Sequence, residues 1–434
     1  MMGSMASEET RTMSSPHIRS SATSEARATS TRAWPTRLLV LGIVLAAVNL
    51  RPAITSLGAL LEEVRDGLGM SGSVAGLLTS VPPLCFAVFG VMAPRLARRF
   101  GPGAVVCAGM AAITAGLLVR PYAGGTAGFL AASALALMGI AVSNVLMPVI
   151  VKRWFPDRIG SMTGLYSMAL ALGTATAAAV TVPATDLLGG EWQPGLALWS
   201  GLAAIAVLPW IPFVRRSAAP PAEQAPAPSG PAHARVERPA LRITRSRTAW
   251  ALAVFFGLQA TAAYITMGWM AQIFRDAGVP AGTAGLLLAV TMVMGVPLAF
   301  VIPRVATRLP HQGPIVLVLG VCGLAGYAGL YFAPAAGAWA WALLLGVSNC
   351  AFPLALTMVG MRARTGAGVA QLSAFAQSTG YLISIPGPLL VGVLYQHSGG
   401  WGLPIALMAA LMVPQMIVGL LAGRDRTVED EAAR

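Results

Sequence analysis

Long apolar runs separated by short polar segments follow one another along most of the chain. Each run has about the 20 residues that a helix needs to cross a bilayer, and the period and length together indicate helices rather than strands. The pattern predicts an all-α membrane protein with twelve transmembrane helices. We expect spans at 38–61, 73–93, 103–120, 126–150, 160–183, 195–214, 248–274, 282–302, 314–333, 336–358, 368–394 and 402–423.

Composition and charge support a membrane protein. The chain of 434 residues is 56% hydrophobic and only 10% charged, whereas soluble domains carry about 25% charged residues. The formal charge of +13 does not indicate nucleic-acid binding, because the basic residues are dispersed between the apolar runs. If both termini and every even-numbered gap are cytoplasmic, 25 of the 29 Lys and Arg residues lie inside, as the positive-inside rule requires.

Two polar segments predict the domain organisation. Residues 1–37 are rich in Ser, Thr, Ala and Arg and predict a disordered cytoplasmic tail. Residues 215–247 contain six prolines and seven arginines and predict a flexible cytoplasmic linker. The linker divides the chain into an N-terminal six-helix half at 38–214 and a C-terminal six-helix half at 248–423, with a cytoplasmic tail at 424–434.

Two sequence motifs recur in corresponding spans of these halves. PRLARRF at Pro94–Phe100 matches PRVATRL at Pro303–Leu309, and SNVLMP at Ser143–Pro148 matches SNCAFP at Ser348–Pro353. The offsets are 209 and 205 residues. Two pairs at nearly one offset predict two parallel, pseudo-symmetric six-helix repeats. This is the 6+6 plan of major facilitator transporters, with a substrate site near the bilayer midplane between the halves.

Arg51 is the formal charge that we expect at the middle of a span. It is followed by Pro52, which loosens the helix at the same depth. A charge there is tolerated where the helix faces protein or a water-filled cavity. Two interpretations stay open: an anion clamp in a substrate cavity, and a structural arginine bonded to carbonyls of a neighbouring helix. No Asp or Glu is expected at mid-span, which argues against a carboxylate proton relay.

Uncharged polar residues of four spans complete the predicted substrate site. Some form pairs four residues apart, which places them on one face of a helix. Polar and aromatic residues of span 7 predict a stripe lining the cavity. Helix packing and repair of proline kinks remain alternative roles. The candidates beside Arg51 are Asn49, Thr55, Asn144, Gln259, Tyr264, Asn349, Gln377 and Tyr381.

Arginines at the cytoplasmic ends of spans 2 and 8 are candidates for a gate. Basic side chains pair with helix C-terminal carbonyls, so these residues could hold the inward gate shut. A role only in setting topology is the alternative. They are Arg95, Arg98, Arg99, Arg304 and Arg308.

Other chemistry finds little support in the sequence. The four histidines fall in tails or loops without metal-ligand spacing, so no metal site is expected. The four cysteines lie in apolar runs and are interpreted as buried apolar residues. Phosphate-binding loops, dinucleotide fingerprints and nucleophile elbows are absent from the sequence. We therefore expect no cofactor and no enzyme activity; the expected partners are a small-molecule substrate and membrane lipid, and the default state is a monomer.

Long motifs resemble one branch of a transporter family. The chain is similar, from Leu38 to Leu421, to the cyanate / 2-nitroimidazole permease (CynX/NimT) branch of the major facilitator superfamily. The resemblance implies a bacterial inner-membrane carrier of small anionic or polar solutes. The chain departs from the loop signature of this superfamily at one position, because Pro94 stands where the signature usually has an Asp. The motifs are NLRPAIT, LLTSVPPLCFAVFGVMAPRLARRFG, NVLMPVIVKRWFPDRIGSMTGLYS, FPLALTMVGMRART and LSAFAQSTGYLISIPGPLL.

The leading hypothesis is a secondary active or facilitative transporter that works by alternating access. Its substrate would be a cyanate-like anion or a nitroimidazole-like compound. A drug or metabolite exporter of the same superfamily is one alternative. A membrane sensor that binds ligand and signals through the linker is another, and it would lose activity when residues 215–247 are replaced by a neutral linker.

Overall fold

The computed structural model describes residues 36–217 and 243–432. The predicted tail at 1–37 and most of the predicted linker at 215–247 lie outside these residues. Contacts divide the chain into two units, Met1–Leu41 and Gly42–Arg434. The contacts discussed below all lie within the second unit.

Twelve helices are long and apolar enough to span a membrane, as the hydrophobic pattern predicts. No strand occurs among the described residues. The ends differ from the predicted ones by a few residues, because polar caps extend the helices past their apolar cores. The spans are Thr36–Ala59, Gly72–Phe100, Pro102–Tyr122, Thr126–Trp154, Ser161–Leu187, Trp192–Val214, Arg247–Asp276, Ala281–Arg308, Gly313–Phe332, Ala338–Met361, Gln371–Ser398 and Gly402–Ala422.

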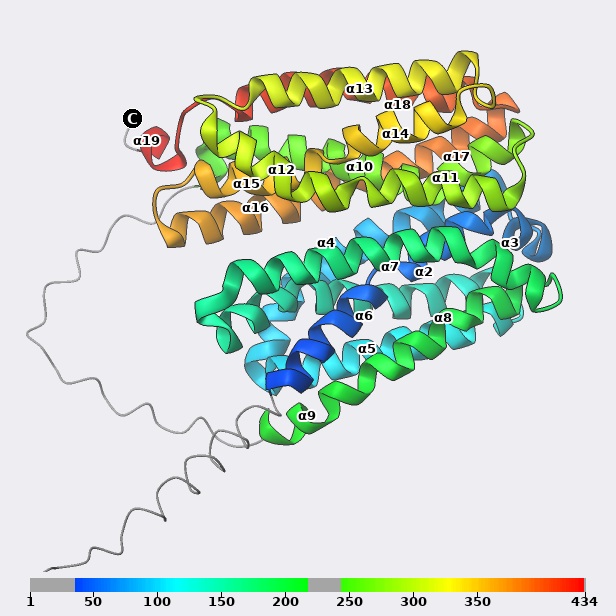
Figure 1. The fold of residues 1–434 in the computed structure, drawn as a ribbon, viewed down its shortest axis with the longest axis horizontal. Helices are drawn as coiled ribbons and strands as arrows, with labels where there is room; N and C mark the ends of the chain where they lie inside the picture. Colours follow the sequence, from blue (N-terminus) through cyan, green and yellow to red (C-terminus); the bar gives the residue numbers. More distant parts are fainter. Residues whose placement is uncertain (1–35, 218–242, 433–434) are drawn as a thin grey trace, which may run out of the picture. The chain divides into compact units, whose positions relative to one another are not determined.

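The six spans of each half form a bundle, and the two bundles lie side by side (Figure 1). The N-terminal half contains α2 (Pro52–Ala59), α3 (Leu61–Leu68), α4 (Gly72–Phe100), α5 (Pro102–Val119), α6 (Thr126–Trp154), α7 (Ile159–Leu187), α8 (Trp192–Val207) and α9 (Ile211–Ser217). The C-terminal half contains α10 (Arg247–Asp276), α11 (Ala281–Val293), α12 (Gly295–Arg308), α13 (Gly313–Phe332), α14 (Ala338–Asn349), α15 (Ala351–Met361), α16 (Gly366–Ser384), α17 (Pro386–Ser398), α18 (Gly402–Ala422) and α19 (Val428–Ala432).

Four spans are interrupted near their middle, each within three residues of a following proline. The first span breaks at Leu50–Arg51 before Pro52, the eighth at Met294 before Pro297, the tenth at Cys350 before Pro353, and the eleventh at Ile385 before Pro386. Proline lacks an N–H and cannot bond the carbonyl four residues back. Backbone carbonyls are therefore released at mid-depth, where a transporter of this plan binds its substrate.

The bundles have two distinct ends. We call the end where α9 stops at Ser217 and α10 starts at Arg247 the linker end, and the opposite end, which carries α3, the α3 end. The halves pack through α2 against α10, α7 against α11, and α4 against α16 and α17. These pairs position the site residues described next.

Candidate functional site

Arg51 lies at the break in the first span. Its backbone has φ −125° and ψ −27°, outside the helical region, and α2 begins at the next residue. The Arg51 carbonyl accepts hydrogen bonds from the backbone N–H of Ile54 at 2.9 Å and of Thr55 at 3.1 Å, and from the Thr55 hydroxyl at 3.2 Å. Thr55 therefore stabilises the break, and the predicted loosening of the helix by Pro52 is present.

The Arg51 guanidinium lies among aromatic side chains from both halves. It is half-buried, donates a hydrogen bond to Tyr264 of α10, and lies close to Tyr166 and Tyr381. Its central carbon is 5.9 Å from the ring centroid of Phe86 in α4. Phe86 in turn stacks on Tyr381 of α16, with centroids 5.0 Å apart.

One amide completes this group of residues. Tyr166 of α7 donates a hydrogen bond to Oδ1 of Asn144 in α6. We call Arg51, Phe86, Asn144, Tyr166, Tyr264 and Tyr381 the Arg51 cluster. Within the described residues, the side chains around the Arg51 guanidinium are tyrosines and a phenylalanine, and none is an Asp or Glu. A cation at mid-span without a counter-ion favours an anion or a strong dipole beside it.

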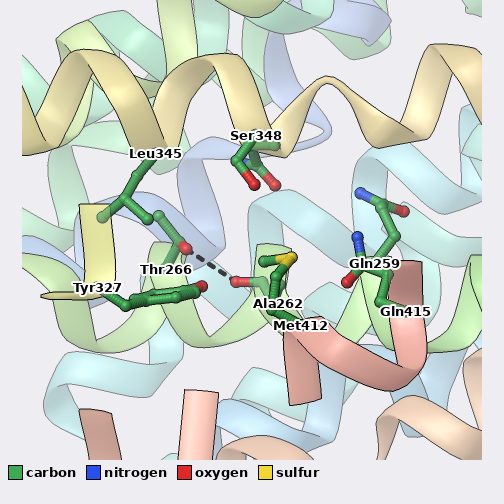
Figure 2. A pocket seen from close by; sticks show the side chains of 9 residues that line it. Gln259, Ala262, Thr266, Tyr327, Leu345, Ser348, Met412 and Gln415 are labelled. Atoms are coloured by element: carbon green, nitrogen blue, oxygen red, sulfur yellow. Dashed lines mark hydrogen bonds between the residues drawn. The ribbon is translucent and has the colours of Figure 1, made fainter. Parts of the chain in front are cut away.

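The structure brings Arg51, Asn144, Tyr264 and Tyr381 together, with Thr55 bonded to the Arg51 backbone. The remaining predicted candidates lie elsewhere. Asn49 is buried and donates from Nδ2 to the carbonyls of Leu45 at 2.8 Å and Leu202 at 3.3 Å, inside the N-terminal half. Gln377 donates to the hydroxyl of Ser373, one turn earlier in α16. Gln259 and Asn349 line a separate pocket (Figure 2).

The predicted polar stripe of span 7 is divided between different surroundings. Gln259 and Thr266 line the pocket of Figure 2, whereas Tyr264 contacts Arg51. Five residues rotate a helix by about 140°, so Gln259 and Tyr264 occupy different faces of α10. Trp269 donates to the Thr79 hydroxyl at 3.2 Å. The interpretation of these residues as one stripe lining a single cavity therefore does not hold for Gln259 and Tyr264.

Two members of the cluster were absent from the sequence-based candidates. Phe86 is an apolar residue within an apolar run, and nothing in the local pattern separates it from a core residue. Tyr166 lies in the motif GLYS, and its hydroxyl becomes significant only through its contact with Asn144. Tyrosines in the middle of spans are the signal that could have found Tyr166, because a buried hydroxyl requires a partner.

The halves are joined tightly at the α3 end. Arg275 at the end of α10 forms ion pairs with Glu62 at 2.8 Å and Glu63 at 2.9 Å in α3. Gln396 of α17 accepts hydrogen bonds from the backbone N–H of Ser73 at 2.8 Å and from its hydroxyl at 2.6 Å. The hydrogen bonds and ion pairs that join the two halves lie toward the α3 end or at Arg51 in the contacts described so far.

The predicted gate arginines lie toward the linker end of α4 and α12, and three of them, Arg98, Arg99 and Arg308, stand in the last turns and are exposed. Arg95 and Arg304 donate to carbonyls one turn earlier in their own helices, Val91 at 3.5 Å and Phe300 at 3.1 Å. These acceptors lie well before the helix ends, so the bonds are not the expected pairing with C-terminal carbonyls, and the gate role of the arginines stays a prediction. Within residues 36–217 and 243–432, no group of three His, Cys, Asp or Glu side chains could hold a metal ion.

Comparison with known proteins identifies relatives among transporters. The family model described as Major Facilitator Superfamily matches residues 39–384. The 2-nitroimidazole transporter of Escherichia coli is 32% identical, over 90% of this chain and 96% of its own length. The cyanate transport protein CynX of the same organism is 29% identical, over 88% and 96%. An uncharacterized transporter of Bacillus subtilis, YycB, is 34% identical, over 90% and 94%.

Solved structures show the same fold at low sequence identity. The nucleoside transporter NupG superposes with a TM-score of 0.69 at 15% identity, covering 89% of this chain and 98% of NupG. The inward open conformation of the xylose transporter XylE from E. coli gives 0.68 at 10% identity, covering 91% and 98%. These similarities establish the arrangement of helices and carry no information about substrate.

Proposed function

Because this chain belongs to the major facilitator superfamily, and to its cyanate and 2-nitroimidazole branch, we propose that it carries a small anionic or polar solute across the bacterial inner membrane by alternating access. The observation that supports this proposal is the Arg51 cluster. Its one cation is held by hydroxyl and aromatic groups contributed by both halves. Sequence similarity identifies the chain as a transporter of this superfamily. The substrate class is our proposal.

Arg51 would bind the negative end of the solute. The tyrosines can donate hydrogen bonds to oxygen or nitrogen atoms of the same solute, and Phe86 supplies an apolar wall. Charge-assisted hydrogen bonds are about twice as strong as neutral ones, so Arg51 would contribute most of the affinity. Cyanate, a linear anion, and a nitro group with its two polar oxygens both satisfy this chemistry.

The origin of the residues suggests how binding is linked to movement. Arg51, Phe86 and Asn144 belong to one half, and Tyr264 and Tyr381 to the other. Rocking of the halves would separate these groups, which weakens the grip on the solute and releases it to one side. We further propose that the linker end faces the cytoplasm, since most Lys and Arg residues lie there. The described conformation, joined at the α3 end, would then be inward-facing.

The aromatic content of the cluster favours a second candidate, transport of neutral heterocycles as a drug or metabolite exporter would perform. Phe86 and Tyr381 stack at 5.0 Å, and Tyr381 also meets Phe256 edge-on, with centroids 5.2 Å apart. A planar ring gains roughly 0.5–1.5 kcal/mol from an aromatic pair beyond area burial. In this case Arg51 would polarise a nitro or carbonyl group rather than pair with a full charge.

Thermal stabilisation of the purified protein tests both candidates. Wild type and Arg51→Gln are melted with small anions (cyanate, nitrite, bicarbonate, short carboxylates) and with neutral nitroimidazoles. A ligand at 100 times its Kd adds about 2.7 kcal/mol to the free energy of unfolding. We expect an anion to stabilise wild type and to leave Arg51→Gln unchanged. Stabilisation by heterocycles alone would support the exporter.

Two further variants separate binding from structure. Tyr264→Phe removes the hydroxyl that accepts from Arg51 and should weaken the response while leaving the fold intact. Arg304→Gln is the matched control. The guanidinium of Arg304 is exposed and donates its hydrogen bond to the Phe300 carbonyl of the same helix. Equal ligand responses in wild type and Arg51→Gln would assign Arg51 a structural role and overturn the proposal.

A further inference from the structure

A second polar pocket lies on the side of α10 that faces away from the Arg51 cluster. Its walls come from α10, α13, α14 and α18, all in the C-terminal half. Figure 2 shows Gln259 and Gln415 close together on one side, Thr266 and Tyr327 on the other, and Ser348 nearby. The walls stand so close together that the pocket has room for about one water-sized particle.

Several polar groups in this pocket lack a protein partner. Oε1 of Gln259, a residue only 3% exposed, is buried and accepts no hydrogen bond. In the described part of the chain, the side chains of Ser348, Asn349 and Gln415 also make no hydrogen bond. An unpaired buried polar group costs about 1–3 kcal/mol, so the buried Oε1 of Gln259 requires an explanation such as a bound water or ion.

The break in the tenth span leaves a backbone carbonyl without its helical donor beside the same pocket. Helix α14 ends at Asn349, which lines the pocket, and α15 starts at Ala351. Pro353 has no N–H for the Asn349 carbonyl, four residues back. In transporters, unwound carbonyls and half-helix C-terminal ends coordinate sodium or protons.

The donor set selects the kind of ligand. Six side chains around the pocket carry oxygen: Gln259, Thr266, Tyr327, Ser348, Asn349 and Gln415. Oxygen ligands suit hard cations. None of the lining residues is a carboxylate, so a divalent cation would leave two charges uncompensated in the membrane. A small monovalent cation fits both the size and the charge of the pocket.

We propose that this pocket binds a sodium ion between α10 and the broken tenth span. Helix α10 presents the pocket on one face and Tyr264, the partner of Arg51, on another. An ion that fixes α10 against α14 therefore also fixes Tyr264 relative to Arg51. This coupling of sodium to the solute depends on the proposed transport function, whereas sodium binding itself does not.

Sodium binding is measured on the purified full chain without solute. Tm is recorded against NaCl, KCl and choline chloride at constant ionic strength, so that general salt effects cancel. We expect a saturable rise in Tm with sodium only. Gln259→Leu should abolish this rise, and Gln259→Glu, which adds a charged ligand, should tighten the apparent sodium affinity by about tenfold. Gln259→Glu keeps the test valid if the leucine variant fails to fold.

Matched variants locate the effect. Thr261→Val alters the same helix, but the Thr261 hydroxyl bonds Gly257 at 2.9 Å and does not line this pocket, so its sodium response should equal that of wild type. Arg51→Gln should also keep the response, which separates this site from the solute site. Equal effects of the three salts, or an unchanged sodium affinity in Gln259→Glu, would overturn the site and leave a bound water as its occupant.

The coupling is measured in proteoliposomes that contain a solute identified by thermal stabilisation. An inward sodium gradient should accelerate uptake by wild type and Thr261→Val but not by Gln259→Leu. Uptake that ignores sodium in wild type would overturn the coupling. If no solute is transported at all, the proposed function fails while the binding measurement stands by itself.

Discussion

The two ends of the molecule are held together in different ways. At the α3 end, the named contacts cross from one half to the other, through Arg275 with Glu62 and Glu63, and Ser73 with Gln396. At the linker end, the bonds of Glu431 in α19 stay within its own half: it accepts from Ser246, which caps α10, and from Thr248 of α10.

This difference indicates which contacts must break for the two halves to separate. Contacts across the halves oppose their separation, whereas contacts within one half move with it. The bonds of α19 can thus persist through a rocking movement, while those of Arg275 must break if the α3 end is to open. Changes at the α3 end should shift the conformational equilibrium, and changes at α19 should affect only the stability of the C-terminal half.

Gly58→Ala should have the largest effect on how closely the two halves pack. A Cβ at Gly58 would overlap the backbone carbonyl of Met267 in α10, which cannot rotate away. We expect the substitution to raise the free energy of the state in which the halves are closed at the α3 end by about 3 kcal/mol. This is enough to change the ratio of closed to open molecules roughly a hundredfold. Spin labels at Asp66 and His397, in a chain with its cysteines replaced, should report a longer distance by pulsed electron resonance.

Gly201→Ala is the control for this substitution. No atom lies within 4 Å of a Cβ built at Gly201 in α8, so the label distance and the transport rate should remain those of wild type. An unchanged label distance in Gly58→Ala would mean that the contact between α2 and α10 does not determine closure.

Arg275→Gln should have an intermediate effect. It removes both ion pairs between the halves, at 2.8 and 2.9 Å. Because Glu62 is 40% exposed, solvent screens the interaction, and we expect a shift of about 1 kcal/mol for the pair of bonds. The same spin labels should show a larger open population, and the difference from wild type should shrink at high salt.

The ion pair at the linker end provides the matched control. Arg364 pairs with Asp430 at 2.8 Å, and both residues belong to the C-terminal half. Arg364→Gln should leave the label distance at the α3 end unchanged. If Arg364→Gln shifts that distance as much as Arg275→Gln, the ion pairs act through general stability rather than by holding the halves together.

The hydrophobic pattern was sufficient to predict the fold. Apolar run lengths specified the twelve spans, and the repeats around Pro94 and Pro303 specified two halves. Pro52 indicated the break at Arg51, because the effect of a proline on its own helix is local. The boundaries 38–214 and 248–423 for the halves stay a prediction, since the residues between 217 and 243 are not described.

The candidate site could be predicted only in part. Arg51 was identifiable because a charge at mid-depth is unusual whatever its neighbours are. The side on which Gln259 lies, and the role of Phe86, depend on how α10 and α4 pack against other helices. A single sequence contains no measure of that packing. The division of α10 into two polar faces therefore emerged only with the structure.

The smallest effect on the label distance is expected from Glu429→Gln with Glu431→Gln. Glu429 accepts hydrogen bonds from the backbone N–H of Thr365 and from its hydroxyl at 3.2 Å, at the start of α16. Burial opposes the charge of both carboxylates, but these bonds outweigh it, so the pKa of Glu429 and that of Glu431 lie below the usual value. We expect a loss of about 1 kcal/mol at pH 7, measured by chemical unfolding, and no change in the label distance.

The pH dependence of that stability distinguishes an electrostatic contribution from simple packing. A carboxylate whose pKa is lower in the folded state stabilises the protein fully above its unfolded pKa, about 4.3 for Glu. The stabilisation is lost as the pH falls through the lower folded pKa. Wild type should therefore lose stability below about pH 4 more steeply than the double variant. Parallel curves would show that α19 is held by the burial of Val428, which is 1% exposed, and not by its acidic residues.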